Sequence, residues 1–157
     1  MLFRSQGDKP VSTVTVDEAM QLCVAFRDYL RANLSRELQD DVFCTARALG
    51  TTTNPADCEA MRAACLAAPT GVEYVDEAFD CSGAGPIAGC DATVDSVEAC
   101  YEADVQLTAD RLDRIDCAIA GDLPALEALQ APLPVPAACT SAGAMACPTL
   151  EDGLFER

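Results

Sequence analysis

The chain contains no histidine and no tryptophan, and Lys9 is its only lysine. Without an imidazole there is no serine–histidine or cysteine–histidine relay and no histidine metal ligand. Catalysis would therefore need carboxylates, the lysine, a tyrosine or a thiolate. Bulky side chains are scarce as well, because five phenylalanines and three tyrosines stand against 28 alanines in 157 residues. We expect a thin hydrophobic core that depends on close approach of the backbones.

Long apolar runs are also missing. No stretch approaches the roughly 20 apolar residues of a membrane-spanning helix. The first ten residues, MLFRSQGDKP, lack the apolar region of a signal peptide. We therefore expect an export signal upstream of this sequence, or the sequence to be a piece of a longer secreted protein.

Cysteine, in contrast, is abundant. The chain has ten cysteines, none adjacent to another and none in the CxxC spacing of redox and zinc sites. This pattern is typical of a disulfide framework in an oxidising compartment, so it predicts a secreted, periplasmic or cell-surface location. All ten are assigned to disulfides: Cys23, Cys44, Cys58, Cys65, Cys81, Cys90, Cys100, Cys117, Cys139 and Cys147.

The net charge is −16, from 26 acidic and 10 basic residues. Such a charge argues against nucleic acid, because phosphate contacts need clustered lysine and arginine. It also argues against anionic membrane surfaces. The acidic residues are spread along the chain rather than clustered in blocks, which is typical of a soluble exported protein. The expected partner is another extracellular or cell-surface protein.

The apolar spacing is helical nearly throughout, so the predicted fold class is all-α, a small disulfide-stapled helical bundle. Predicted helices begin at capping residues and run from Thr15 to Asn33, from Ser35 to Gly50, and from Asn54-Pro55 to a point before Pro69. Thr93 is predicted to cap a fourth helix, a further helical stretch is predicted to end at Gly121, and a short helix is predicted after Asp122. Periodicity alone does not decide whether the helix breaks near Thr108 or continues. Residues 72–79 are compatible with either a short helix or an extended segment.

The predicted organisation is one domain over 13–148, preceded by a disordered segment 1–12 and followed by a tail 149–157. Its halves, 13–68 and 91–148, are joined by a loop 69–90. A weak internal repeat relates them, because Thr15-Val16-Asp17 precedes Cys23 and Cys44, and Thr93-Val94-Asp95 precedes Cys100 and Cys117. The repeat predicts two related helical hairpin units.

Hairpin geometry then ranks the disulfide pairings. Residues equidistant from a turn face each other, which favours Cys23–Cys44 and Cys100–Cys117. A rival pairing, Cys44–Cys58, is symmetric about the 50–54 connection. Cys58 and Cys65 lie about 10.5 Å apart on one helix and so are not expected to pair with each other. They are expected to reach Cys81 and Cys90 instead, which leaves Cys139–Cys147 as a local closure of the irregular 131–148 tail.

Few groups of residues indicate chemistry. Candidate carboxylates occur at 40–41, 76–77, and 110, 113 and 116, and interleaved arginines favour a solvated helix face. Asp91, Asp95 and Glu98 do not match a calcium loop. No catalytic residue, cofactor site or metal site is assigned. The glycine-rich loop between Cys81 and Cys90 is either a linker or a display loop that presents Pro86-Ile87.

The stretch T-V-D-S-V-E-A-C at 93–100, with Cys117 and alanine-rich helices, resembles modules of uncharacterised cysteine-rich secreted proteins or lipoproteins of myxobacteria-like bacteria. The resemblance covers about 90–120 and more weakly 13–67, and it implies no activity. The chain departs from these proteins at its N-terminus, which has neither a signal sequence nor a lipobox cysteine.

These observations favour a non-enzymatic structural or interaction module. The alternatives are a carrier of a small apolar ligand held between stapled helices, and an inhibitor that acts through the Cys81–Cys90 loop. A secreted enzyme ranks last.

Overall fold

The computed structural model describes residues 7–75, 77 and 80–141, and within these ranges the chain is helical with no strand. The all-α prediction is confirmed. The α-helices are α1 (Val16–Asn33), α2 (Arg36–Leu49), α3 (Pro55–Leu66), α4 (Val94–Leu112), α5 (Leu123–Gln130) and α6 (Ala137–Ser141). Short 3-10 turns are η1 (Val11–Thr13), η2 (Cys81–Gly83) and η3 (Cys117–Ile119).

Helices α1 to α5 begin where the sequence predicts, whereas α6 lies in the 131–148 segment that the sequence predicts to be irregular. At each of these five N-caps a side chain accepts a hydrogen bond from a backbone N–H in the first turn, which satisfies a donor that has no partner within the helix. At α1 the capping box is complete, because the Glu18 side chain also accepts from the Thr15 backbone N–H. The capping residues of α1 to α5 are Thr15, Ser35, Asn54, Thr93 and Asp122.

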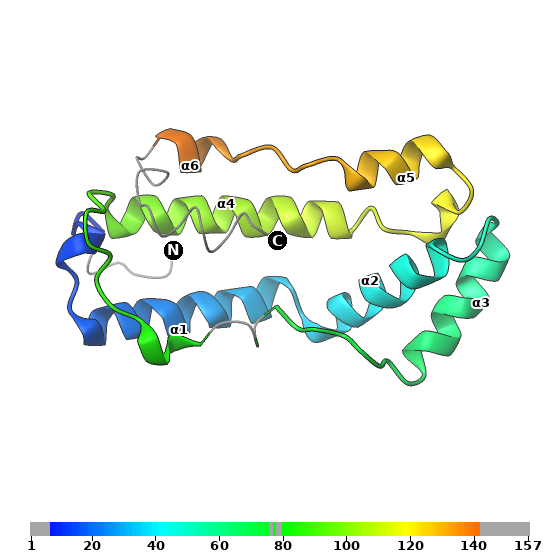
Figure 1. Ribbon diagram of the computed structural model, residues 1–157, viewed down its shortest axis with the longest axis horizontal. Coiled ribbons are helices and arrows are strands. Elements are labelled where there is room, and N and C mark those ends of the chain that lie inside the picture. The colour runs from blue at the N-terminus through cyan, green and yellow to red at the C-terminus, as the bar shows by residue number, and fades with distance from the viewer. Residues whose placement is uncertain (1–6, 76, 78–79, 142–157) are drawn as a thin grey trace.

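The two longest helices, α1 and α4, lie side by side and run in the same direction (Figure 1). The chain bends after α1 but does not reverse, so α2 continues away from it, and α3 then folds back against α2. The segment after α3 returns along α2 and α1 to the start of α4. The chain after α4 reverses; α5 lies beyond the end of α4, and the chain then returns so that α6 packs against α4 (Figure 1).

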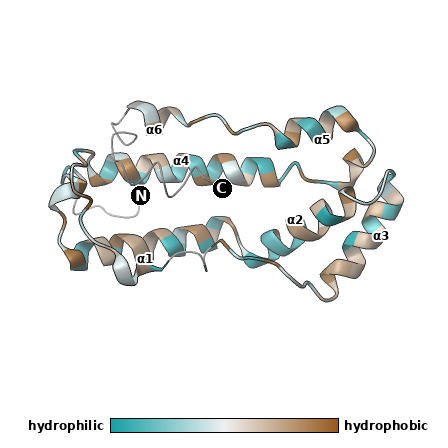
Figure 2. Cartoon of the chain, viewed as in Figure 1, coloured by the Kyte–Doolittle hydropathy of each residue, from teal (hydrophilic) through white to brown (hydrophobic). Residues whose placement is uncertain are grey.

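The core consists of small separate clusters rather than one mass. One contains Val11, Val14 and Val94; a second contains Leu30, Leu34 and Val105; a third contains Ala48, Leu49, Cys58, Cys117 and Ala120. Figure 2 shows apolar and polar residues alternating along every helix. Each cluster combines residues from both halves of the sequence, so the halves 13–68 and 91–148 pack as one unit. The thin core expected from the composition is present.

The segment before α1 is ordered over residues 7–13, where the sequence suggests disorder. Its backbone pairs with the start of α4: Val11 N–H donates to the Ala92 carbonyl at 2.9 Å, and Val94 N–H donates to the Lys9 carbonyl at 3.0 Å. The ammonium of Lys9 pairs with the Glu18 carboxylate at 2.5 Å. These contacts bring the N-termini of α1 and α4 to the same end of the molecule.

Four disulfides cross-link the described helices: Cys23–Cys81, Cys44–Cys65, Cys58–Cys117 and Cys100–Cys139. Their Cα–Cα distances are 4.4–5.7 Å, within the usual range. Cys90 is fully buried and also disulfide-bonded. Four disulfides indicate an oxidising, extracytoplasmic environment. Cys147 lies outside the described residues.

The hairpin pairings predicted from the sequence are wrong. Cys23–Cys44 does not form because the chain bends at Leu34 without reversing. Cys100–Cys117 does not form because α4 runs unbroken through Thr108. The two-hairpin repeat is therefore not seen, although Thr15 and Thr93 do cap the long parallel helices.

The remaining predicted disulfide pairings agree only in part with the structure. The exclusion of a Cys58–Cys65 bond is confirmed, but these cysteines bond to Cys117 and Cys44 rather than to Cys81 and Cys90. The rival Cys44–Cys58 pairing is wrong for the same reason. Cys139–Cys147 is also wrong, since Cys139 bonds to Cys100 on α4.

Gly121 gives the first test of this packing. Its φ is +85°, and a Cβ at this position would overlap the carbonyl oxygen of Thr53. We expect Gly121→Ala to lower the free energy of unfolding by more than about 2 kcal/mol, because backbone strain and a clash add together. Gly71 is the matched control: its φ is +81° but nothing lies near an added Cβ, so Gly71→Ala should cost about 1 kcal/mol. Equal losses in thermal unfolding would contradict the close approach of Gly121 to Thr53.

The Lys9–Glu18 pair predicts an acid-sensitive contact. The Glu18 pKa falls from 4.5 to about 2, because its carboxylate accepts hydrogen bonds from Lys9 and from the Thr15 backbone. A lowered pKa gives stability that is present above pH 4.5 and is lost as the pH falls towards 2. Over that window the unfolding midpoint of Glu18→Gln should fall less steeply than that of the native chain. The exposed Glu127→Gln serves as control; parallel curves for Glu18→Gln and the native chain would refute the contact.

Candidate functional site

A concave feature lies between α2 and α3. These helices form an antiparallel hairpin joined by residues 50–54. Cys44–Cys65 bridges the two helices, and the Arg62 guanidinium reaches from α3 to the Asp41 carboxylate on α2 at 2.5 Å. These bonds fix the distance between the helices.

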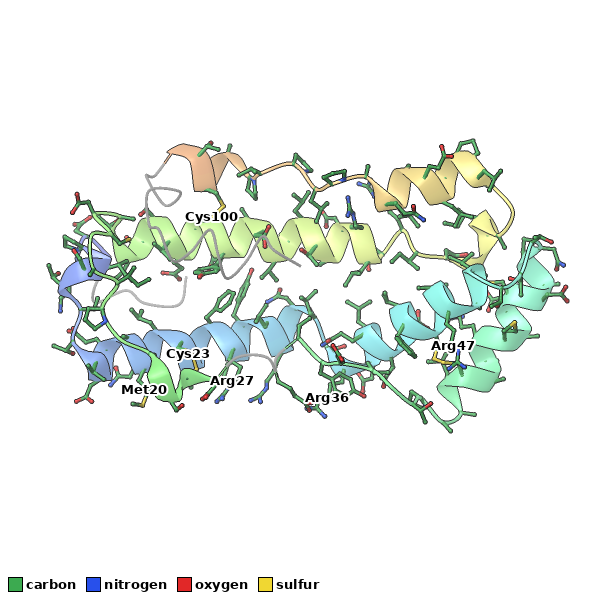
Figure 3. All side chains as sticks on the ribbon, viewed as in Figure 1. Met20, Cys23, Arg27, Arg36, Arg47 and Cys100 are labelled. Carbon is green, nitrogen blue, oxygen red and sulfur yellow. A yellow bond between two sulfur atoms is a disulfide. The ribbon has the colours of Figure 1, made fainter. Side chains whose placement is uncertain are left out.

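A cavity of about 310 Å³ opens between them, and we call it the α2–α3 groove. Its lining residues are Cys44, Arg47 and Ala48 from α2, with Met61, Ala64, Cys65 and Ala68 from α3 and the residues just after it. Cys44 and Ala48 are buried and form the floor, whereas Arg47, Met61 and Ala64 are exposed at the rim. Figure 3 draws Arg47 beside the disulfide, between the two helices.

The lining positions follow helix geometry. Residues 44, 47 and 48 share one face of α2, and residues 61, 64, 65 and 68 share one face of α3. Alanine at three of the seven positions keeps the groove open. The Thr51 hydroxyl contacts the Met61 sulfur at 3.3 Å, which holds the thioether at the turn end of the groove.

Arg47 is the one charged residue among the described residues that line the groove. No described carboxylate lies within ion-pair distance of it. Arg62, on the facing helix α3, pairs with Asp41 and Glu59. The groove therefore combines an apolar floor with one uncompensated positive charge.

The carboxylates noted in the sequence take structural roles. Asp41 pairs with Arg62, and Asp40 accepts a hydrogen bond from the Tyr74 hydroxyl at 2.9 Å. Glu77 pairs with Arg36, while Asp76 lies outside the described residues. Asp110 accepts from Gln106, Asp113 is the C-cap of α4, and Asp116 caps η3. Asp91, Asp95 and Glu98 lie around the start of α4.

Asp40 and Glu77 both lie near Tyr74, Asp40 as the acceptor of its hydroxyl and Glu77 as the partner of Arg36, whose guanidinium lies over the Tyr74 ring. In the described part of the chain, no group of three or more cysteines, aspartates and glutamates has the arrangement of a metal site.

The tyrosines lie at contacts between segments. Tyr101 on α4 stacks against Phe26 on α1, with ring centroids 4.3 Å apart. Burial raises the pKa of Tyr101 to about 12, and the nearby Asp104 carboxylate adds to the shift. Burial also raises the pKa of Tyr29. Phenolates at these positions are disfavoured at neutral pH, so these side chains are poorly suited to act as nucleophiles.

The glycine-rich loop is anchored at both ends. Cys81 is bonded to α1 through Cys23, and Cys90 is buried in the cluster with Val11. Ile87 packs against that cluster and is only partly exposed, while Pro86 is exposed. The loop is not closed by a bond between its own two cysteines.

The chain matches no protein-family model, and neither the curated proteins nor the solved structures include a significant match. Among the described residues, no helix combines the length and apolar character needed to cross a membrane.

Accessibility of the sulfurs predicts the order of reduction. Cys58 and Cys117 are 0% and 1% exposed, whereas Cys65 is partly exposed in the α2–α3 groove. A reductant must reach a sulfur to attack it. Brief treatment with dithiothreitol in native buffer should therefore open Cys44–Cys65 before Cys58–Cys117. Alkylation and peptide mass spectrometry read the order, and opening of Cys58–Cys117 first would contradict the burial.

Proposed function

We propose that this chain is a non-enzymatic structural or protein-interaction module that works outside the cytoplasm, secreted, in the periplasm or at a bacterial cell surface. The observation that carries the proposal is the set of long-range disulfides. Three of them join residues 39 to 59 positions apart, and they tie α1 to the segment before α4, α3 to the turn after α4, and α4 to α6. A rigid body of this kind is suited to presenting a fixed surface to a partner.

The carboxylates support a non-enzymatic role. The carboxylates for which the structure gives a contact form ion pairs, hydrogen bonds or helix caps. The pKa values of the tyrosines are raised rather than lowered, which does not favour a nucleophilic tyrosine. The resemblance of residues 93–100 to cysteine-rich exported bacterial proteins agrees with the proposed location.

The surface best suited to a partner is the segment Pro132–Pro136. It lies between α5 and α6 and runs along α4 (Figure 1). Both ends are held, because Arg111 donates a hydrogen bond to the Ala131 carbonyl and Cys139 is bonded to Cys100. Val135 is 45% exposed between prolines that restrict the backbone. A segment already ordered loses little entropy when it binds.

Binding of the labelled protein to the cells that export it tests this proposal. We expect saturable binding that is lost when surface proteins of the cells are digested with protease. Val135→Glu should weaken it about tenfold, while Leu123→Glu, at an exposed site on α5, should leave it unchanged. Binding that survives the protease, or that ignores Val135→Glu, would overturn the proposal.

A carrier of a small apolar ligand is the second candidate, and the α2–α3 groove is the observation that favours it. The Cys81–Cys90 inhibitor loop gains less support, because Ile87 packs inward.

A further inference from the structure

We infer that the α2–α3 groove binds a small amphipathic carboxylate, with its carboxylate on Arg47 and its alkyl chain on the floor of the groove. This inference deepens the carrier candidate by assigning the site and the class of ligand, and it does not depend on the scaffold role.

The groove is preorganised. The Cys44–Cys65 bond and the Arg62–Asp41 pair join its two walls, so a ligand would not have to bring the helices together. Avoiding that ordering cost raises the affinity that a small contact area can give. The hydrogen bond from Thr51 to Met61 fixes the turn end in the same way.

The lining suits an alkyl chain. Cys44 and Ala48 form a buried floor, and the alanines at 64 and 68 line the open side. The disulfide and the Met61 thioether add polarizable sulfur, which adapts well to flexible apolar ligands. Lining of this kind with a single polar anchor is the usual composition of a small-molecule site.

Charge complementarity selects the head group. The chain as a whole carries −16 and repels anions, so an anionic ligand needs a local cation that is not already neutralised. Arg47 meets that condition, because no described carboxylate pairs with it and no acidic residue lines the groove. A guanidinium binds a carboxylate through two parallel hydrogen bonds.

The volume limits the size of the ligand. At roughly 30 Å³ for each water-sized heavy atom, 310 Å³ holds about ten such atoms. Octanoate has this size. The seven lining residues are also far fewer than the roughly 20–30 that each partner contributes to a stable protein–protein interface.

Calorimetric titration of the oxidised protein with octanoate, below its micelle concentration, tests the inference. We expect one site, and an affinity about tenfold higher for octanoate than for neutral octanamide. Arg47→Gln should remove that preference. Arg114→Gln, at an exposed arginine outside the groove, is the matched control and should preserve it.

A variant that fills the groove tests the inference independently of Arg47. Ala64 is exposed, so Ala64→Leu should leave the helices intact while it weakens octanoate and octanamide together. Circular dichroism checks the fold, and if this variant does not fold, Arg47→Gln still decides the question. Absence of saturable binding, equal affinity for the two ligands, or no effect of Arg47→Gln would overturn the inference. A dimer of the native chain that Ala64→Leu dissociates would assign the groove to a second copy and would also overturn it.

The two proposals fail separately. Octanoate binding is measured on the purified chain, whereas the scaffold role is measured on cells with Val135 variants.

Discussion

The Cys58–Cys117 disulfide joins α3 to the turn that follows α4, and both of its sulfurs are buried. It encloses a loop of 59 residues that includes the irregular segment between α3 and α4. A loop of that length restricts the unfolded chain by an amount worth about 4 kcal/mol in the chain-entropy account. Around it pack Ala48, Leu49 and Ala120, with Ile115, Ile119 and Leu126 partly buried against them. The end of the molecule that carries the α2–α3 groove depends on this bond.

The opposite end is held mainly by backbone contacts. α1 and α4 are parallel, so the positive ends of their dipoles lie together, an arrangement that repels. Asp17 and Glu18 in the first turn of α1, and Asp95 in that of α4, place negative charge there and offset the repulsion. The segment over residues 7–13 then bonds to the start of α4. An acidic composition thus has a local structural use, in addition to its effect on solubility.

The helix starts could be predicted because capping is local. Thr15 with Glu18, and Asn54 with Pro55, each identify a first turn within four residues. The disulfide pairings could not, because they depend on where the chain reverses. The rule that residues equidistant from a turn face each other fails at Leu34 and Thr108, because the chain only bends or continues there. At the 50–54 connection the chain does reverse, and the rule favours Cys44–Cys58, yet the bond that closes the α2–α3 hairpin is Cys44–Cys65. The position of a reversal therefore does not by itself fix how the two helices align.

The α2–α3 groove could not be predicted from the sequence either. Met61, Ala64, Cys65 and Ala68 have the spacing of one helical face, yet that spacing alone favours an ordinary packed face. Only the pairing of α2 with α3 brings Arg47 to the same opening. The interleaved arginines predict that Asp110, Asp113 and Asp116 lie on a solvated helix face. Only Asp110 does so, exposed on α4, whereas Asp113 is the C-cap of α4 and Asp116 caps η3.

Mapping the disulfides of the oxidised protein tests the central claim most directly. Digestion without reduction at acidic pH, followed by mass spectrometry of the linked peptides, prevents exchange while the bonds are read. The account predicts peptides that join Cys23 to Cys81, Cys44 to Cys65, Cys58 to Cys117 and Cys100 to Cys139. Peptides joining Cys23 to Cys44 and Cys100 to Cys117 would contradict it, because they require two separate hairpins in place of the cross-linked parallel helices.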